Sequence, residues 1–363
     1  MRAREIIAGV LVSGLVVAAG DRSADGCTTV ALRHDAEVLV AKSYDYTMGH
    51  GLVLTNARGV AKISLPVAGG GPRAVWTSRF GSVTFNQYGR ELPAGGMNEA
   101  GLVVEVMWLD GTRYPAPDGR PTLPDLQWIQ YQLDSWATTA EVVAHVDDQR
   151  VDSTTARVHF LVCDRTAECA AVEFLDGSTV VTTGEAMPAR ALTNDSYRDS
   201  ADFLARHRGF GGTQELRSSA GSLERFVRAA DHARLVLAGE DRGETGLVDD
   251  AFSTLDDVSQ GSGSVWNIVY DPVRLTVYFR TFEQPRIKRL DLEALDFSCT
   301  APMKALDVQA ERWGNVTASL HDYTVDMNRR IVRASLAGHY TRLPRGAEEF
   351  LARFPENFRC ADR

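Results

Sequence analysis

The sequence lacks the signals that mark several large functional classes. It has no basic run and its formal net charge is −9, so we expect no nucleic-acid partner. The eight histidines show no metal-ligand spacing. There is no glycine-rich phosphate loop, no dinucleotide fingerprint and no Gly-x-Ser-x-Gly element. We therefore expect neither a metal nor a cofactor.

Apolar runs long enough to cross a membrane are also missing. The N-terminal run covers residues 6–19, which is about fourteen residues where a span needs about twenty. It follows Arg2 and Arg4 and ends in small residues, which is the pattern of a secretory signal. We predict a signal peptide over 1–19, a short pro-segment over 20–26 and a single domain over 27–363. The protein would then be periplasmic or secreted, with no stable membrane span.

Cys27 stands directly after the predicted pro-segment. Once the bond between Gly26 and Cys27 is cut, a thiol and a free α-amine lie on the same residue, and these can serve as nucleophile and base. The two groups ordinarily titrate at about 8.5 and about 7.7–8.0, so proton transfer between them costs little. Two alternatives for this terminus are a buried N-terminal helix and a lipoprotein signal, in which Cys27 carries lipid.

Cysteine is scarce, with five residues in the chain. Cys163 and Cys169 flank a turn-like stretch between two apolar runs, a spacing that suits a cross-strand disulfide. Cys299 and Cys360 could tie the last third of the chain to its tail, and Cys27 would then remain unpaired. Four reduced core cysteines, or another pairing, stay open because the sequence does not fix connectivity.

Apolar periodicity and turn signals predict a mixture of strands and helices, without a linker, a repeat or a low-complexity tract. Helices are predicted at 125–136, at 138–146 behind a capping box of Thr138 and Glu141, and at 223–237. Strands are predicted at 28–32, 37–43, 51–56, 60–65, 158–162, 171–175, 179–183, 265–270 and 275–281. This succession favours an α+β fold in which helices cover sheets.

Several short motifs, in order along the chain, resemble one known family. They are Cys27-Thr28-Thr29, Tyr44-Asp45-Tyr46, Leu54-Thr55-Asn56, the run 96–102, Leu192-Thr193-Asn194, Arg225-Phe226-Val227-Arg228 and Trp266-Asn267-Ile268-Val269-Tyr270-Asp271. The ordered set resembles the choloylglycine hydrolase family of N-terminal-nucleophile hydrolases, which contains penicillin V acylases and conjugated bile acid hydrolases. The likeness is to the Gram-negative branch of the penicillin V acylases. It implies a four-layer αββα sandwich.

The resemblance implies that Cys27 is the nucleophile and that its own α-amine is the general base. Asp45 matches the aspartate that hydrogen-bonds the new amino terminus. Arg225 matches an arginine held close to the cysteine, where a positive charge favours the thiolate. From the residues alone, Asp45 could cap a turn and Arg225 could lie on a helix surface. Arg228, three residues on, is an alternative match.

Asn194 matches the side-chain donor of the oxyanion hole, and the backbone N–H of Trp108 would be the second donor. A turn-forming asparagine is the simple alternative. Two residues depart from the family pattern. Lys42 replaces an arginine and loses its planar fork, and Trp108 suggests a pocket for an apolar or aromatic acyl group. The short interval between Asn194 and Arg225 leaves little room for the family's assembly loop, although a homo-oligomer stays open.

Substrate contacts are predicted for Lys42, Met48, Trp76, Phe80 and Trp128, and the last four suit a plain core equally well. The implied function is hydrolysis of a small-molecule N-acyl amide through a thioester. Penicillin V-type amides rank first, N-acyl homoserine lactones second and bile acid conjugates third. The alternatives are an enzyme of the same fold that acts on ceramide-like or peptide amides, and a lipidated envelope binding protein without catalysis.

Overall fold

The structure is a computed structural model that describes residues 26–153, 156–239, 246–339 and 346–361. The predicted signal peptide over 1–19 lies outside the described residues, as does the predicted pro-segment apart from Gly26. Among the residues that are described, no helix is long and apolar enough to cross a membrane.

The first large sheet, called sheet A, has seven strands and begins with the predicted hairpin at the start of the mature chain. β1 (Thr28–His34) and β2 (Glu37–Asp45) pair antiparallel, with Thr28 opposite Ser43. The turn between them places Asp35 at a φ of 50°. The sheet continues through β15 (Ser264–Asp271), β16 (Thr276–Thr281), β17 (Lys288–Asp291) and β19 (Gly314–Asn315), while β14 (Ala191–Leu192) flanks β1.

The second large sheet, sheet B, has nine strands, and every neighbouring pair is antiparallel. Its order is β13 (Ser178–Thr183), β12 (Cys169–Leu175), β11 (Val158–Cys163), β8 (Val103–Trp108), β7 (Pro93–Asn98), β6 (Ser82–Asn86), β3 (Leu52–Asn56), β18 (Lys304–Asp307) and β20 (His321–Asp322).

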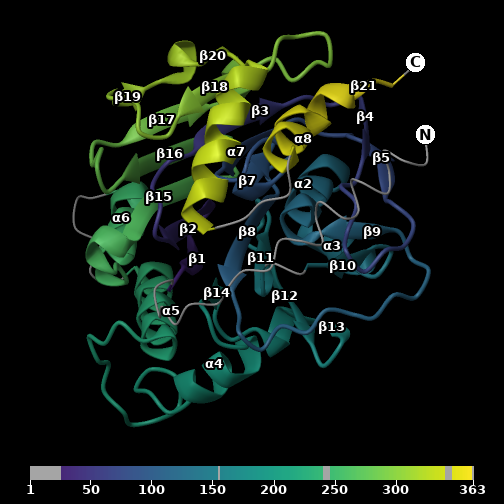
Figure 1. The fold of residues 1–363 in the computed structure, drawn as a ribbon. Coiled ribbons are helices and arrows are strands. Elements are labelled where there is room, and N and C mark those ends of the chain that lie inside the picture. Colours follow the sequence, from purple (N-terminus) through teal and green to yellow (C-terminus); the bar gives the residue numbers. More distant parts are fainter. Residues whose placement is uncertain (1–25, 154–155, 240–245, 340–345, 362–363) are drawn as a thin grey trace.

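Helices cover the outer face of each sheet (Figure 1). On sheet A, α5 (Ser222–Ala238) packs on β1, and α6 (Leu247–Asp257) packs on β2 and β15. On sheet B, α2 (Asp125–Ser135) packs on β7 and β8, while Ile331 of α7 (Val325–His339) packs on Leu52 and Leu54 of β3. The predicted four-layer αββα sandwich of the α+β class is confirmed.

The shorter elements complete the chain. They are α3 (Thr139–Ala144), α4 (Tyr197–Leu204), α8 (Ala347–Arg353), the pair β9 (Thr122–Pro124) and β10 (Arg150–Asp152), and a small sheet of β21 (Arg359–Cys360), β4 (Val60–Ile63) and β5 (Val75–Thr77). Short 3₁₀ turns lie at Gly184–Ala186, Gly261–Gly263, Leu292–Ala294, Thr317–Ser319 and Phe354–Asn357.

The two large sheets are joined by aromatic rings and by one buried polar chain. Phe85 of β6 packs edge-on against Tyr270 and Phe279 of sheet A, with ring centroids 6.2 and 5.3 Å apart. Such pairs contribute about 0.5–1.5 kcal/mol each beyond the area that they bury. Beside them, the Tyr270 hydroxyl donates to Glu105 Oε1 at 2.6 Å, and Glu105 Oε2 lies 3.5 Å from Lys42 Nζ. A buried charge pair therefore crosses the interface in which the nucleophile strand lies.

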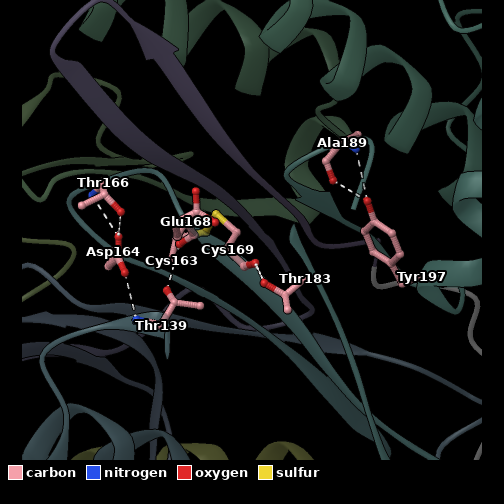
Figure 2. The surroundings of a disulfide bond; sticks show 9 residues. All are labelled: Thr139, Cys163, Asp164, Thr166, Glu168, Cys169, Thr183, Ala189 and Tyr197. Atoms are coloured by element: carbon pink, nitrogen blue, oxygen red, sulfur yellow. Dashed lines mark hydrogen bonds between the residues drawn. A yellow bond between two sulfur atoms is a disulfide. The ribbon is translucent and has the colours of Figure 1, made fainter. Parts of the chain in front are cut away.

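The predicted disulfides are both formed. Cys163 and Cys169 close the hairpin of β11 and β12, and Cys299 joins Cys360. Figure 2 shows how the closed end of the hairpin is anchored. Asp164 accepts the N–H groups of Thr166 and Thr139, each at 2.9 Å, which ties the turn to α3. Cys27 is the remaining, unpaired cysteine.

Most predicted elements are confirmed, and the differences have local causes. The capping box of Thr138 and Glu141 begins α3, but that helix ends at Ala144 instead of 146. Four helices were not predicted, namely α4, α6, α7 and α8. Three of these are short or rich in charged residues, and α4 and α8, with eight and seven residues, offer few repeats of the apolar pattern that identifies a helix in sequence.

Candidate active site

The candidate site is built around Cys27, which precedes the first residue of β1. Extending the β1–β2 register by one residue places Cys27 opposite Tyr44. The side chain is 6% exposed, and its Sγ lies 3.7 Å from the main-chain oxygen of Asp45. Burial raises the pKa of the thiol, against the opposing effect of the positive charges of Lys42 and Arg225, while Asp45 raises it further. These relations describe the chain in which Gly26 still precedes Cys27.

Asp45 ends β2 and is 2% exposed. Its Oδ1 accepts the hydroxyl of Ser43 at 2.6 Å, and its Oδ2 accepts Gln260 Nε2 at 3.3 Å. A register shift in β15 brings Ser264 opposite Asp45, where its hydroxyl also bonds the carboxylate. Burial raises the pKa of Asp45 despite these bonds and the nearby positive charges. A cationic group that arrives beside this carboxylate would favour its ionised form.

Arg225 reaches the nucleophile from the first turn of α5 and is 1% exposed. Its Nη1 donates to the main-chain oxygen of Cys27 at 2.8 Å and to Thr28 Oγ1 at 2.7 Å. Its Nη2 donates to Asn194 Oδ1 at 2.9 Å. Arg228 instead bonds the main-chain oxygens of residues 217 and 219 on the outside of this cluster. The helix therefore presents Arg225, and not Arg228, to the nucleophile.

Asn194 follows β14, and its side chain is oriented by Arg225. A guanidinium can only donate, so the atom that it contacts must be the amide oxygen, and the NH₂ group must face the other way. That group donates to the main-chain oxygen of Trp108 at 2.9 Å. The two predicted oxyanion donors thus lie in contact although 86 residues separate them. The Trp108 ring is 38% exposed and donates through Nε1 to Asp110 at 2.7 Å.

Lys42 lies on β2 and is completely buried between the sheets. Its Nζ bonds the main-chain oxygen of Val106 and lies 3.2 Å from the sulfur of Met107 and 3.5 Å from Glu105. Burial raises the pKa of Glu105 to about 7, although Lys42 and the Tyr270 hydroxyl favour the charged form. Lys42 thus acts on Cys27 through its charge, from inside the interface.

Known proteins that resemble this chain are amide hydrolases. No family model matches the chain. A penicillin V acylase from Pectobacterium atrosepticum is 26% identical over 261 residues, which is 61% of this chain and 69% of that protein. The solved penicillin V acylase from Agrobacterium tumefaciens superposes with a TM-score of 0.71 and 27% identity, over 82% of this chain and 98% of that one.

These relatives support the resemblance to the choloylglycine hydrolase family. Both penicillin V acylases agree with its Gram-negative branch. Two variants of conjugated bile acid hydrolase from Clostridium perfringens share the family fold, with TM-scores of 0.63 and 0.61 at 16% and 15% identity. They cover 82% of this chain and 97% and 96% of their own.

Three residues predicted to contact substrate lie away from the nucleophile. Trp128 is fully buried and stacks on Phe160, with ring centroids 4.4 Å apart, on the face of sheet B that α2 covers. Trp76 donates to Asp134 of α2 at 2.8 Å, and the main-chain N–H of Phe80 donates to the same residue. Trp128 belongs to α2, Trp76 packs against that helix from β5, and the main chain of Phe80 is bonded to its last turn, so we do not retain these residues in the proposed site. Aromatic character alone does not indicate whether a ring lines a pocket or packs in the core.

Met48 is half-buried, and its main-chain oxygen accepts Gln87 Nε2 at 2.5 Å. It lies three residues beyond Asp45, and we keep it as a predicted substrate contact. In the described parts of the chain, no group of three or more histidine, cysteine or acidic side chains is arranged to hold a metal ion.

Sequence reasoning missed several residues around this site. Ser43, Ser264 and Gln260 surround Asp45, and Gly26 packs so closely that a Cβ there would lie 1.8 Å from Gln260 Nε2. His159 and Glu173 were also missed, although they support the segment that carries Asn194. Ser43 lies two residues before Asp45 on β2, so side-chain alternation along the strand places both on one face, and this was the one available signal.

Proposed function

We propose that the chain is an N-terminal cysteine hydrolase that cleaves linear N-acyl amides, with penicillin V-type amides as the preferred class. Amide hydrolysis is the reaction of the relatives that this chain resembles. The proposal concerns the role of Cys27, the roles of the residues around it and the substrate.

The observation that carries the proposal is the set of bonds made by Arg225. One guanidinium contacts the main chain of Cys27 through one nitrogen and the amide oxygen of Asn194 through the other. This fixes the distance between a nucleophile and an amide donor that comes from a different element. A reacting carbonyl placed between them meets sulfur on one side and an N–H donor for its developing negative charge on the other.

Activation requires removal of the residues that precede Cys27. An amide nitrogen has no basic lone pair, whereas the freed α-amine can take the thiol proton. The new ammonium then lies at the start of β1, close to Asp45, whose carboxylate is already oriented by Ser43 and Gln260. A general base contributes about 10²–10⁴-fold to such reactions, so the uncut chain is expected to be nearly inactive.

The chemical steps then follow from the positions of the groups. The Cys27 sulfur attacks the amide carbon, and the oxyanion is held by the Asn194 amide and the backbone N–H of Trp108. The α-ammonium returns its proton to the leaving amine as the C–N bond breaks, which leaves a thioester on Cys27. Water, deprotonated by the same α-amine, hydrolyses the thioester and releases the acid. Lys42 and Arg225 favour the thiolate by their charge.

Two observations support an acyl group of the penicillin V type. Two relatives above 25% identity are penicillin V acylases. The partly exposed Trp108 ring beside Asn194 also offers an apolar face to an aryl or long alkyl chain. N-acyl homoserine lactones, which carry such a chain on an amide, are proposed as second substrates.

The two disulfides support the proposed periplasmic or secreted location, since such bonds persist in oxidising compartments. The structure gives no support to the lipidated alternative. The Cys27 sulfur lies inside the sandwich, and a lipid attached to it would have to displace Asp45 or Arg225.

The test combines a mass measurement with a substrate panel. We expect the purified enzyme to begin at Cys27 with an unmodified amine and to release 6-aminopenicillanic acid from penicillin V. The variant Cys27→Ser should lose this activity and keep its fold, while Cys163→Ser with Cys169→Ser, as the control, should lose stability only. Full activity of a chain that still carries residues before Cys27 would refute the mechanism. Faster turnover of bile acid conjugates than of penicillin V would refute the substrate assignment.

A further inference from the structure

Behind Asn194, a buried histidine and a buried glutamate hold the main chain that carries this residue. His159 of β11 and Glu173 of β12 are 0% and 1% exposed. They lie directly opposite each other when the register of the hairpin is extended by one pair beyond Phe160 and Val172. His159 Nδ1 is 3.1 Å from Glu173 Oε1, and His159 Nε2 is 2.8 Å from the main-chain oxygen of Thr193.

The pair holds both ends of the segment that contains Asn194. Thr193, on one side, is held through its carbonyl by His159. Tyr197, on the other side, donates its N–H to Glu173 Oε1 at 3.0 Å. The Tyr197 ring is fixed in turn, because its hydroxyl donates to the main-chain oxygen of Ala189 at 2.6 Å (Figure 2). Ser222 Oγ also accepts the Asn194 N–H at 2.8 Å, so the backbone of Asn194 is held by Ser222 together with the pair of His159 and Glu173.

That bond requires one proton more than a neutral histidine beside an ionised carboxylate provides. A carbonyl oxygen only accepts, so the bond to Thr193 places a hydrogen on Nε2. A neutral ring then has only a lone pair on Nδ1, and Glu173 Oε1 also offers lone pairs. The contact between them needs a hydrogen, carried either by an imidazolium facing a carboxylate or by a carboxylic acid facing a neutral ring. In this ring orientation Nδ1 faces Glu173 and Nε2 faces Thr193, whereas a flipped ring would direct its carbon atoms at both partners.

We propose that His159 and Glu173 are positioning residues for hydrolysis, which share one proton and thereby fix the Asn194 amide at the oxyanion. This inference rests on the proposed function. Arg225 orients the Asn194 side chain, and the pair places its backbone. The other titratable groups around the pair are Tyr197 on α4, Arg190 before β14, and Glu105 on β8, which is bonded by Lys42 and Tyr270.

Two substitutions of Glu173 separate its shape from its charge. In Glu173→Gln the amide oxygen still accepts from Tyr197 and from a charged His159, but no negative charge retains the proton. A neutral His159 could then keep both bonds only if the amide turned its NH₂ group toward Nδ1, and the Tyr197 N–H would lose its acceptor. The activity of this variant relative to the wild type should fall as the pH rises. In Glu173→Ala the support is lost at every pH. Asp164→Asn is the matched control, because this carboxylate is equally buried and accepts main-chain N–H groups at the far end of the same hairpin.

The experiment uses mature protein whose mass confirms Cys27 as the first residue. Penicillin V hydrolysis is followed between about pH 6 and pH 9, which brackets the ordinary titration of histidine and the α-amine. We expect Glu173→Ala to lower kcat by about 10- to 100-fold with little change in KM, because a displaced donor mainly affects the transition state. Glu173→Gln should approach the wild type at the acid end and fall behind it at the alkaline end. Asp164→Asn should match the wild type throughout.

Alkylation of Cys27 by iodoacetamide is the second readout, since this reaction needs the thiolate and no oxyanion hole. Its rate should be unchanged in all variants. The inference is overturned if both Glu173 variants keep the wild-type kcat at every pH, or if alkylation falls in parallel with hydrolysis. If Glu173→Ala fails to fold, the pH dependence of hydrolysis by Glu173→Gln alone tests the inference. If the wild type shows no Cys27-dependent hydrolysis, the proposed function fails, and that result is distinct from the failure of this inference.

Discussion

Replacing Arg225 by lysine keeps a positive charge near Cys27 but removes the fork that joins the nucleophile to Asn194. The guanidinium makes hydrogen bonds to Cys27, Thr28 and Asn194 of 2.7–2.9 Å, and a lysine ammonium at the end of a flexible chain cannot reproduce their geometry. The amide of Asn194 is then free to rotate, and the donor is out of place for part of the time.

The size of the effect is bounded by the loss of Asn194 itself. Removing one oxyanion donor costs about 10²–10³-fold in kcat, or roughly 2.7–4 kcal/mol. We expect Arg225→Lys to cost about 10- to 100-fold, that is roughly 1.4–2.7 kcal/mol. If Arg225 acts through Asn194, the double variant with Asn194→Ala should be no slower than Asn194→Ala alone, so the two losses should not add.

The assay is a double-mutant cycle on penicillin V hydrolysis, with Arg228→Lys as the matched control. Arg228 lies three residues further along the same helix, is 7% exposed and bonds residues 217 and 219 instead of the site. Its substitution should change stability and leave kcat unaltered. Additive losses of Arg225→Lys and Asn194→Ala would refute the positioning argument and would assign the loss to the bonds of Arg225 with Cys27 and Thr28.

Three further predictions concern maturation and stability. Gly26→Ala should retard removal of the leader, because a Cβ would lie 2.3 Å from Arg225 Nη2, and intact mass measures the uncut fraction. The unfolding free energy of the wild type should decrease between about pH 4 and pH 6, and the variant Asp125→Asn should show a smaller decrease. Burial raises the pKa of Asp125 to about 6, so its ionisation in the folded state costs up to about 3 kcal/mol. Removing the Cys299–Cys360 bond, which spans 61 residues, should cost about 4 kcal/mol in denaturant unfolding, against about 2 kcal/mol for the hairpin disulfide.

For each of these three predictions, one result would contradict the reasoning. Normal processing of Gly26→Ala would mean that Arg225 and Gln260 move aside during the cut. The sign for Asp125 follows from a folded-state pKa above the unfolded one, so stability must decrease as the pH rises through this window. Parallel pH curves for Asp125→Asn and the wild type would contradict it. A larger loss from opening the hairpin disulfide than from opening the long loop would contradict the chain-entropy account.

The sequence predicted the fold well where the signals are local. The hairpin of β1 and β2, the helix α2 and the capping box of α3 follow from alternation, periodicity and one side-chain bond, all of which lie within a few residues. The order of strands in the two sheets is a long-range property that was not predicted, and the resemblance to a family implied only the four layers. The helix α4 was missed because it is short and lies outside the main apolar pattern.

In the candidate site, the residues found through motifs and the residues chosen for their side-chain type had different outcomes. Asp45, Asn194, Arg225 and Trp108 were found through motifs, and the structure brings them together at Cys27. Their roles remain predictions. Trp76, Phe80 and Trp128 were chosen for aromatic character alone, which says nothing about the layer in which a ring lies.

The pair of His159 and Glu173 could have been predicted. The disulfide between Cys163 and Cys169 fixes the hairpin register. His159 lies four residues before Cys163 and Glu173 lies four residues after Cys169, so the two residues face each other. A buried histidine facing a buried glutamate in a strand pair would then have stood out. The bond to Thr193 could not have been predicted, because that segment approaches from sheet A.

The guanidinium that holds Cys27 comes from 198 residues further along the chain. During biosynthesis the thiol emerges first and α5 much later, roughly 10–40 s afterwards at ordinary elongation rates. Until α5 has been made, the main chain of Cys27 therefore lacks the guanidinium that holds it in the folded protein. The candidate site is therefore completed only after α5 has been synthesised.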